Sequence, residues 1–358
     1  MTKKIVIITQ TLLSGGAEKQ SVYLAKVLSK NFQVYLIVLK GNSIEKKFLD
    51  IIKDENVEII RLSGILFKNI IDTYKLFKKE NIQIIFSYLA SGNFINGIVG
   101  LIARVPNRIG GIRNAELSSK KLPFERLFHN YFLTKTISNS HSAVTGLSKL
   151  KFKERKFHVI HNAFELNQSF ISRTENDEVN IISMARFVPQ KDYFTALEAI
   201  KILSSKMKSL KNKFVYYLIG YGEMEQAIRD KVKELDLEGV VRIIIKPNNL
   251  VDYFKRADIF LSTSLFEGMS NSVMEAMSFS LPIIATPAGD MEYLVKEGEN
   301  GYLCEMRNPV QIANKLLLII QDFELRKKMG EKSYQIISEN FTMDRFRNNY
   351  VTFIKNLN

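Results

Sequence analysis

This chain of 358 residues contains little cysteine, histidine or proline. Its single cysteine, Cys304, excludes a framework of intramolecular disulfides and favours a reducing compartment. The four histidines occur in no spacing that suits a metal ligand set, such as two histidines separated by three residues. The sequence therefore predicts neither a disulfide-stabilised fold nor a structural metal.

Long hydrophobic runs are also missing. Two lysines followed by the apolar residues 5–8 look like the start of a signal peptide, but this run is too short and no small-residue cleavage site follows it. A buried first strand is the better interpretation. The longest apolar stretch elsewhere, 94–105, contains Asn96 and Arg104 and falls short of the roughly 20 residues that span a bilayer. We therefore expect no transmembrane segment.

Basic charge, in contrast, is abundant. Lysine and arginine number 51 against 37 aspartates and glutamates, which gives a net charge of +14. An excess of this size favours an anionic partner through long-range attraction, and nucleic acid, a membrane surface and phosphorylated substrates are the candidates. The lysines are spread along the chain, so compositional bias is an alternative explanation.

The pattern of apolar residues predicts two α/β domains. Short β-branched runs alternate with helical patterns, which is typical of parallel sheets covered by helices on both faces. A chain of this length suits two domains of about 150 to 180 residues. The predicted strands are 5–9, 33–39, 57–62, 82–88, 108–112 and 135–138 in the first half, and 179–184, 214–219, 240–245, 259–262, 282–285 and 301–304 in the second.

The expected domain order places a polar linker in the middle of the chain. We expect a Rossmann-like, doubly wound domain at 1–165, a linker at 166–178 and a second such domain at 179–340, with a final helix in 341–358. Two such sheets face each other across a cleft in the predicted arrangement. Ligands of open parallel sheets bind beyond the carboxyl ends of the strands, so the functional residues should follow strands directly.

Glycines follow a predicted strand in each half. Gly15 and Gly16 stand where the first helix begins, and glycines at such a turn let backbone N–H groups approach an anion at the positive end of the helix. Gly220 ends a strand of the second half in the same manner. A tight turn without a ligand explains these glycines equally well, because the dinucleotide pattern Gly-x-Gly-x-x-Gly is absent.

Two basic residues share the loop after the first strand of the second half. Arg186 and Lys191 lie on either side of Pro189, which restricts the turn, and Asp192 is placed to cap the next helix. Arginine binds phosphate oxygens through its planar fork, and lysine acts as a point charge. The loop therefore suits a diphosphate, although exposed basic loops are common.

The most informative segment combines a strand end, a loop carboxylate and a helix start. Glu267 falls in the loop, where it can accept hydrogen bonds from sugar hydroxyls. The helix begins near Ser270 or Asn271, and the first N–H groups, at Asn271 and Ser272, can bind phosphate oxygens. Glu275 can accept hydrogen bonds from a ribose diol or, alternatively, complete a capping box with Ser272.

Taken together, these segments resemble family 4 of the retaining glycosyltransferases, which have the GT-B fold. The resemblance extends over nearly the whole chain, and its specific part is the Arg186 and Lys191 pair combined with the spacing Glu267-x7-Glu275. It implies that the two cations neutralise the departing diphosphate. Glu267 then contacts the donor sugar, Glu275 binds the ribose, and Gly16 approaches the diphosphate from the first domain.

The activity implied by the resemblance is a retaining transfer of a hexose or N-acetylhexosamine from a nucleotide-diphosphate sugar, with a UDP-sugar as the expected donor. The acceptor is a lipid-linked or surface glycan, and the final helix packs back on the first domain. No metal or other cofactor is expected, because the cations and the helix dipole stabilise the leaving group. The expected catalytic residues are Glu267, Lys191 and Arg186, and the expected donor-binding residues are Gly15, Gly16, Arg113, Gly220, Gly268, Met269, Ser270, Asn271, Ser272 and Glu275.

Two loops depart from the family pattern. Family members often carry a histidine in the first domain where this chain has Arg113 and Asn114. We expect Arg113 to contact a phosphate of the donor or of the acceptor instead. A glycine that is usual near the base-binding loop is replaced around Lys246 and Pro247.

The acceptor is expected to bind the first domain. Two segments there, 66–79 and 120–132, mix basic and aromatic residues, a pattern typical of binding to anionic membrane surfaces. Ordinary helices with solvated lysines are the alternative. The sequence thus predicts a cytoplasmic enzyme that works at the inner face of the cytoplasmic membrane and has no nucleic-acid partner.

Two other functions remain open at this point. A nicotinamide-dependent oxidoreductase also uses doubly wound domains, but the dinucleotide fingerprint is missing. A non-catalytic protein that binds polyanions through its charge of +14 is the second alternative.

Overall fold

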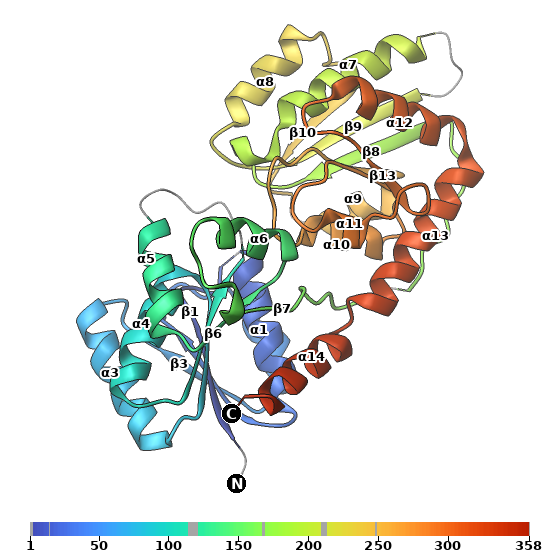
Figure 1. The fold of residues 1–358 in the computed structure, drawn as a ribbon. Coiled ribbons are helices and arrows are strands. Elements are labelled where there is room, and N and C mark those ends of the chain that lie inside the picture. The colour runs from blue at the N-terminus through green and yellow to red at the C-terminus, as the bar shows by residue number, and fades with distance from the viewer. Residues whose placement is uncertain are drawn as a thin grey trace. The chain divides into compact units, whose positions relative to one another are not determined.

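The chain folds into two compact units. In a computed structural model, the described residues are 3–13, 15–113, 121–166, 169–208, 213–247 and 249–357. Unit 1 consists of Met1–Ala163 and Met343–Asn358, and unit 2 of Phe164–Thr342 (Figure 1). Asn114 and Lys120, and Asn167 in the predicted linker, lie outside the described residues. Across the described ranges, no helix combines the length and the apolar composition needed to cross a bilayer.

Unit 1 is built on a seven-stranded sheet with the order β3-β2-β1-β4-β5-β6-β7. All neighbouring strands are parallel, and residues 5–8 at its centre are completely buried. The strands are β1 (Lys4–Thr9), β2 (Gln33–Val38), β3 (Val57–Arg61), β4 (Ile84–Ser87), β5 (Asn107–Ile112), β6 (Lys135–Ser138) and β7 (Phe157–Val159). The edge strand β7 was not predicted, because three half-exposed residues give no periodic signal.

Helices cover both faces of this sheet. They are α1 (Gly16–Ser29), α2 (Lys46–Ile52), α3 (Leu66–Glu80), α4 (Leu89–Ile102), α5 (Leu122–Leu127), α6 (His141–Lys149) and α14 (Met343–Lys355). Helix α14 comes from the C-terminus and inserts Phe346, Tyr350 and Phe353 into the core between the sheet and α1. The rings of Tyr350 and Phe86 meet edge to face, with their centroids 5.5 Å apart.

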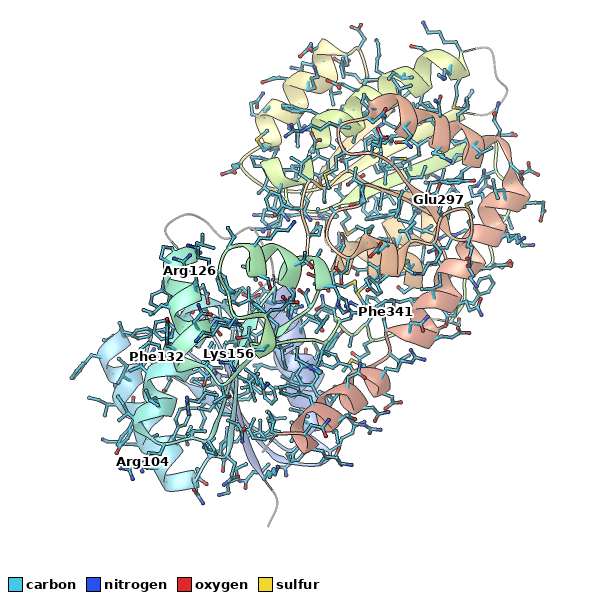
Figure 2. All side chains as sticks on the ribbon, viewed as in Figure 1. Arg104, Arg126, Phe132, Lys156, Glu297 and Phe341 are labelled. Carbon is cyan, nitrogen blue, oxygen red and sulfur yellow. The ribbon has the colours of Figure 1, made fainter. Side chains whose placement is uncertain are left out.

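A short π-helix, Phe128–Phe132, follows α5 directly. Its carboxyl end lies against Lys156, whose Nζ donates hydrogen bonds to the carbonyls of His129, Asn130 and Leu133 (Figure 2). A cation at a helix carboxyl end satisfies carbonyls that have no partner within the helix. This contact fixes the end of the segment in which the sequence predicted a membrane-binding pattern.

Unit 2 repeats the architecture with a six-stranded parallel sheet of order β10-β9-β8-β11-β12-β13. Its strands are β8 (Glu178–Met184), β9 (Lys213–Gly220), β10 (Val241–Ile245), β11 (Ile259–Ser262), β12 (Ile283–Ala285) and β13 (Gly301–Leu303). Its helices are α7 (Tyr193–Met207), α8 (Glu225–Glu234), α9 (Leu250–Arg256), α10 (Asn271–Ser278), α11 (Met291–Leu294), α12 (Pro309–Gln321) and α13 (Phe323–Asn340). The predicted doubly wound α/β architecture is confirmed for both halves.

The polar segment between the two sheets is attached to unit 2. The backbone N–H of Phe164 donates to the carbonyl of Phe341 at 2.8 Å, and that of Ile171 donates to Ser280 Oγ at 3.3 Å. The guanidinium of Arg173 donates to three backbone carbonyls at the ends of α9 and α10. Most described residues of this segment therefore belong to the packing of the second unit.

The order of strands in unit 2 reverses between β8 and β11, which are neighbours in the sheet. The connections that follow these two strands run to helices on opposite faces of a doubly wound sheet, so the carboxyl ends of β8 and β11 border a crevice. The loops that leave these ends contain Arg186, Lys191 and Glu267.

Candidate functional site

The loop from β8 to α7 positions Lys191. Pro189–Lys191 form a single 3-10 turn, and Asp192 adopts a left-handed conformation with φ of +45°. The carboxylate of Asp192 accepts hydrogen bonds from Thr195 Oγ1 at 2.7 Å and from the Thr195 N–H. The predicted capping of α7 by Asp192 is confirmed. Arg186 lies exposed on the same loop.

Two of the predicted catalytic residues contact each other. Lys191 Nζ donates a hydrogen bond to Glu267 Oε1 and forms an ion pair with it, although the residues are 76 positions apart. The same carboxylate oxygen accepts a hydrogen bond from Ser264 Oγ at 3.0 Å. The side chains of Lys191 and Glu267 are 15% and 12% exposed, so the ion pair is largely shielded from water.

Hydrogen bonds to backbone carbonyls join the loops that carry this ion pair. Thr263 Oγ1 donates to the carbonyls of Lys191 and Asp192 at 2.9 and 3.0 Å. The carbonyl of Gln190 accepts from the Leu265 N–H at 2.8 Å, and the Gln190 side chain donates to a carbonyl of the other loop. The two loops are therefore held together independently of the charges, which is how a preorganised site is built.

A third loop, between β12 and α11, packs against the backbone of Glu267. Gly289 has φ of +68°, and a Cβ added there would lie 2.6 Å from the Glu267 carbonyl and overlap the Gly268 carbonyl. The Asp290 N–H donates to that Gly268 carbonyl at 3.1 Å. Only glycine fits the position. Sequence reasoning gave Gly289 no role, and a glycine shortly after a strand was the only available signal.

Helix α10 begins at Asn271, and its N-cap Ser270 forms a side-chain hydrogen bond with Ser272 Oγ at 3.3 Å but none that caps the helix backbone. Ser272 is therefore the second helical residue, and a capping box of Ser272 with Glu275 does not form. The capping box therefore does not explain Glu275. Ser272 and Lys191 line the same small cavity of about 10 Å³.

The other predicted donor-binding residues of unit 2 are enclosed by packing. Met269 and Ser270 are each 4% exposed, and the Met269 side chain belongs to the hydrophobic core. Gly268 is buried as well. A Cβ on Gly220 would overlap the Ala185 carbonyl, so close packing against the β8 loop requires this glycine. Gly220 and Gly268 have no side chain, so any contact of these two residues with a donor uses their backbone.

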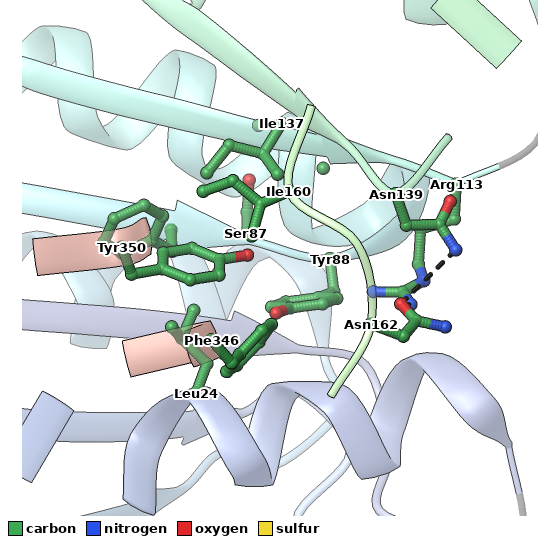
Figure 3. A pocket seen from close by; sticks show the side chains of 13 residues that line it. Leu24, Ser87, Tyr88, Arg113, Ile137, Asn139, Ile160, Asn162, Phe346 and Tyr350 are labelled. Carbon is green, nitrogen blue, oxygen red and sulfur yellow. Dashed lines mark hydrogen bonds between the residues drawn. The ribbon is translucent and has the colours of Figure 1, made fainter. Parts of the chain in front are cut away.

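In unit 1, Arg113 lies at the carboxyl end of β5 (Figure 3). Its guanidinium donates a hydrogen bond to Asn162 Oδ1, which also accepts one from Asn139 Nδ2 at 3.4 Å. The guanidinium carbon is 5.7 Å from the centroid of the Tyr88 ring, a cation–π distance. Burial lowers the pKa of Arg113, and Tyr88 acts in the opposite direction.

Two tyrosines line a cavity next to Arg113. Tyr88 and Tyr350 line a cavity of about 20 Å³ together with Arg113 (Figure 3). Burial raises the pKa of Tyr88, against the effects of Arg113 and of a hydrogen bond with Tyr350, and raises that of Tyr350 well above its ordinary value. Both hydroxyls therefore stay protonated near neutral pH, and Tyr350 links the C-terminal helix α14 to this site.

The start of α1 differs from the predicted anion site. Helix α1 begins at Gly16, as expected, but a Cβ on Gly15 would lie 2.7 Å from the carboxyl carbon of Glu18. Glu18 Oε1 accepts a hydrogen bond from Thr11 Oγ1 at 3.0 Å. The carboxylate of Glu18 thus already places negative charge at the positive end of the helix. A role of Gly15 and Gly16 in donor binding stays a prediction.

Comparison with known proteins agrees with this architecture. Residues 165–336 match the family described as Glycosyl transferases group 1. An uncharacterized glycosyltransferase of Haemophilus influenzae is 26% identical, and the match covers 93% of this chain and 94% of the relative. The N-acetylgalactosamine-N,N'-diacetylbacillosaminyl-diphospho-undecaprenol 4-alpha-N-acetylgalactosaminyltransferase of Campylobacter jejuni is 24% identical, over 92% of this chain and 94% of the relative.

The fold also matches a solved structure. Anabaena HepE, crystallised in complex with UDP and glucose, is 18% identical and reaches a TM-score of 0.81, with 99% of this chain and 100% of HepE covered. Relatives along the whole chain are thus glycosyltransferases, which leaves no support for the oxidoreductase or the non-catalytic polyanion-binding alternative. The chain is a glycosyltransferase with the GT-B fold, and its residues 165–336 belong to the group 1 glycosyltransferases, known as family 4.

Proposed function

We propose that this enzyme transfers a hexose or N-acetylhexosamine from a UDP-sugar to a lipid-linked glycan, with retention at the anomeric carbon and without a metal ion. The observation that carries the proposal is the contact between Lys191 and Glu267 beside the start of α10. A cation, a carboxylate and the N–H groups of a helix start are the groups that a sugar diphosphate needs.

Each residue of this site has a proposed task in the transfer. Lys191 and Arg186 bind the diphosphate and stabilise the negative charge that develops on it as the bond to the sugar breaks. The backbone N–H groups of Asn271 and Ser272 add the positive end of α10. Glu267 accepts hydrogen bonds from the sugar hydroxyls. Glu275, one turn further into α10, binds the ribose.

Metal independence follows from the same charges. In metal-dependent transfer, a divalent cation neutralises the diphosphate. In this protein Lys191, Arg186 and the start of α10 supply that charge, so we propose that chelators leave the activity unchanged. HepE was crystallised with UDP, which supports UDP as the nucleotide of the donor.

A lipid-linked acceptor is supported by an apolar pocket in unit 1. The pocket has a volume of about 320 Å³ and lies where β1 and β2 end, between α3, α4 and α5. Leu66, Phe94, Ile95 and Phe124 form its apolar wall, and Lys40 stands at its border. Ligand pockets of parallel sheets occur at this edge. The Campylobacter relative is named for a diphospho-undecaprenol substrate, which agrees with such an acceptor. We therefore propose that the enzyme acts at the inner face of the cytoplasmic membrane.

Two measurements test the proposed donor. Thermal unfolding is followed with UDP, GDP or ADP, each with magnesium or with a chelator, and we expect stabilisation by UDP in both conditions. UDP-glucose, UDP-galactose and the corresponding UDP-N-acetylhexosamines are then tested as donors with lipid-linked glycans from bacterial membranes as acceptors. Stabilisation by GDP alone, or transfer that stops in the chelator, contradicts the proposal.

A further inference from the structure

The two basic-aromatic segments predicted to face a membrane differ in the structure. In α5 and the π-helix, the phenylalanine rings pack on one another: Phe124 and Phe128 have centroids 4.4 Å apart, and Phe128 is 3% exposed, whereas Tyr131 is 69% exposed. In α3, Phe77 is buried, but Phe67 is 73% exposed. The structure thus packs the phenylalanines of α5 and the π-helix against one another and leaves two of the three aromatic side chains of α3, Phe67 and Tyr74, at the surface.

The apolar residues of α3 form a continuous stripe on its outer side. Phe67, Ile71 and Tyr74 are exposed and follow the spacing i, i+4, i+7, which places them on one face of the helix. The opposite side, which faces the core, carries Phe77 together with the polar Asn69 and Thr73, and all three are buried. Surface helices usually keep their apolar residues on the inward side, whereas α3 carries apolar residues on its outer side as well. Contiguous apolar patches of this kind mark interaction sites.

Positive charge surrounds the stripe. Lys68, Lys75, Lys78 and Lys79 are all exposed on α3. Glu80 accepts hydrogen bonds from Lys4 Nζ and from the Tyr35 hydroxyl, each at 2.8 Å, and lies 3.8 Å from Lys79 Nζ. Asp72 is the only other acidic residue of the helix. The helix therefore combines apolar and cationic groups, which matches the apolar interior and anionic headgroups of a bilayer.

Neighbouring elements extend this surface. Leu101 and Ile102, at the carboxyl end of the adjacent helix α4, are 47% and 60% exposed, and Arg104 follows them (Figure 2). Ile65 and Leu66, at the start of α3, are 63% and 56% exposed. Leu66 also lines the apolar pocket, so the pocket opens beside the exposed end of α3.

We propose that the outer face of α3, formed by Phe67, Lys68, Ile71, Tyr74, Lys75 and Lys78, binds the surface of an anionic phospholipid bilayer. The three apolar side chains enter the boundary between headgroups and acyl chains, and the lysines contact lipid phosphates. This inference rests on the proposed lipid-linked acceptor, because it brings the apolar pocket next to the layer that holds such lipids. The surface itself binds any anionic bilayer, whatever the acceptor.

The absence of tryptophan from the chain provides a direct test. Phe67→Trp introduces a single fluorescent reporter on the face, and Leu318→Trp, at a 43% exposed position of α12 in unit 2, is the matched control. Vesicles of phosphatidylcholine mixed with phosphatidylglycerol should shift the emission of the first variant to shorter wavelength and leave the second unchanged. Pure phosphatidylcholine, or high salt with the anionic vesicles, should remove the shift.

Substitutions within the face separate its two components. Lys68→Gln combined with Lys75→Gln and Lys78→Gln should weaken sedimentation with anionic vesicles by about a hundredfold, from three lost lysine contacts. Phe67→Ser combined with Ile71→Ser should weaken it as well, although the charge is unchanged. Because all these positions are exposed, folding should be preserved, which circular dichroism and thermal unfolding check.

The outcomes distinguish this inference from the proposed function. Equal spectra for the two tryptophan variants, or undiminished sedimentation of the face variants, overturn the inference. A dimer that dissociates in the variant combining Phe67→Ser with Ile71→Ser, without vesicle binding by the wild type, also overturns it. Transfer to a detergent-solubilised acceptor should be the same in the face variants as in the wild type. If the wild type transfers no sugar but binds vesicles, the proposed function fails and the membrane surface stands.

Discussion

Replacing Glu267 by glutamine tests whether this carboxylate competes with the diphosphate for Lys191. Glutamine keeps the size of the side chain and an oxygen that can accept from Ser264 Oγ, but removes the charge that pairs with Lys191. Exposed ion pairs contribute about 0–1 kcal/mol, and breaking a buried one costs about 3–5 kcal/mol. With the two side chains 15% and 12% exposed, we expect the free energy of unfolding to fall by about 1–3 kcal/mol.

The effects on donor binding and on turnover should have opposite signs. UDP has no sugar for Glu267 to bind, so in Glu267→Gln the released Lys191 is available to the diphosphate, and the affinity for UDP should be equal to or up to about tenfold above that of the wild type. Turnover of a UDP-sugar should fall, because hydrogen bonds between a charged group and the sugar hydroxyls contribute about 1.5–3 kcal/mol each. The expected loss in kcat/KM is roughly 10- to 100-fold per hydrogen bond.

Calorimetry with UDP and steady-state rates with the UDP-sugar measure these quantities. The variants are Glu267→Gln, Lys191→Met and the double variant, and Lys231→Met is the matched control. Lys231 forms an ion pair with Glu234 at 2.7 Å on α8, away from these loops, and its loss should change neither UDP affinity nor turnover. Lys191→Met should weaken UDP binding. If Glu267→Gln weakens it as much, the carboxylate positions the lysine rather than competing for it, and the reasoning is refuted.

Further predictions concern the supporting parts of the structure. Removal of divalent metal by a chelator should leave the rate of transfer unchanged, and a rate restored only by added magnesium contradicts this. Gly289→Ala should lower the free energy of unfolding by about 1–3 kcal/mol in denaturant titrations, because φ is positive and the new Cβ overlaps the Gly268 carbonyl; an unchanged midpoint argues against the overlap. Tyr350→Phe should reduce turnover several-fold with a loss in the free energy of unfolding of only about 1 kcal/mol, because it removes a hydroxyl from the cavity that Arg113 also lines. Turnover equal to that of the wild type contradicts a role of this hydroxyl in positioning Arg113. Burial lowers the pKa of His129 to about 4. The unfolded chain therefore takes up the proton first as the pH falls below about 6.5, and up to about 3 kcal/mol of stability should be lost between that pH and about 4; urea titrations at several pH values should show a smaller loss in His129→Gln.

The sequence by itself determined the two sheets, because strands buried on both faces appear as short apolar, β-branched runs. The boundaries of β11 (Ile259–Ser262) and β6 (Lys135–Ser138) agree with the prediction to the residue, and most others differ by one or two residues. Strand β7 was missed, since its three residues are only partly buried. Its place at the edge of the sheet depends on pairing with β6, which local sequence does not express.

For the candidate site, the sequence indicated the loops but not the contacts within them. Lys191 and Glu267 were both predicted because each follows a strand, and parallel strands bring their carboxyl ends to one edge. The ion pair between these side chains forms between two loops that are distant in sequence. The close packing of Gly289 against the backbone of Glu267 depends on a third such loop. The start of α10 at Asn271, which excludes the capping box, also emerged only from the structure.

The same division applies to α3. Its helical periodicity is visible in the sequence, and so is its mixture of aromatic and basic residues. Periodicity defines two faces of a helix but does not decide which one packs on the sheet. The tertiary structure places Asn69 and Thr73 inward and leaves Phe67 and Ile71 exposed, because the position of a helix is set by the packing of the whole layer.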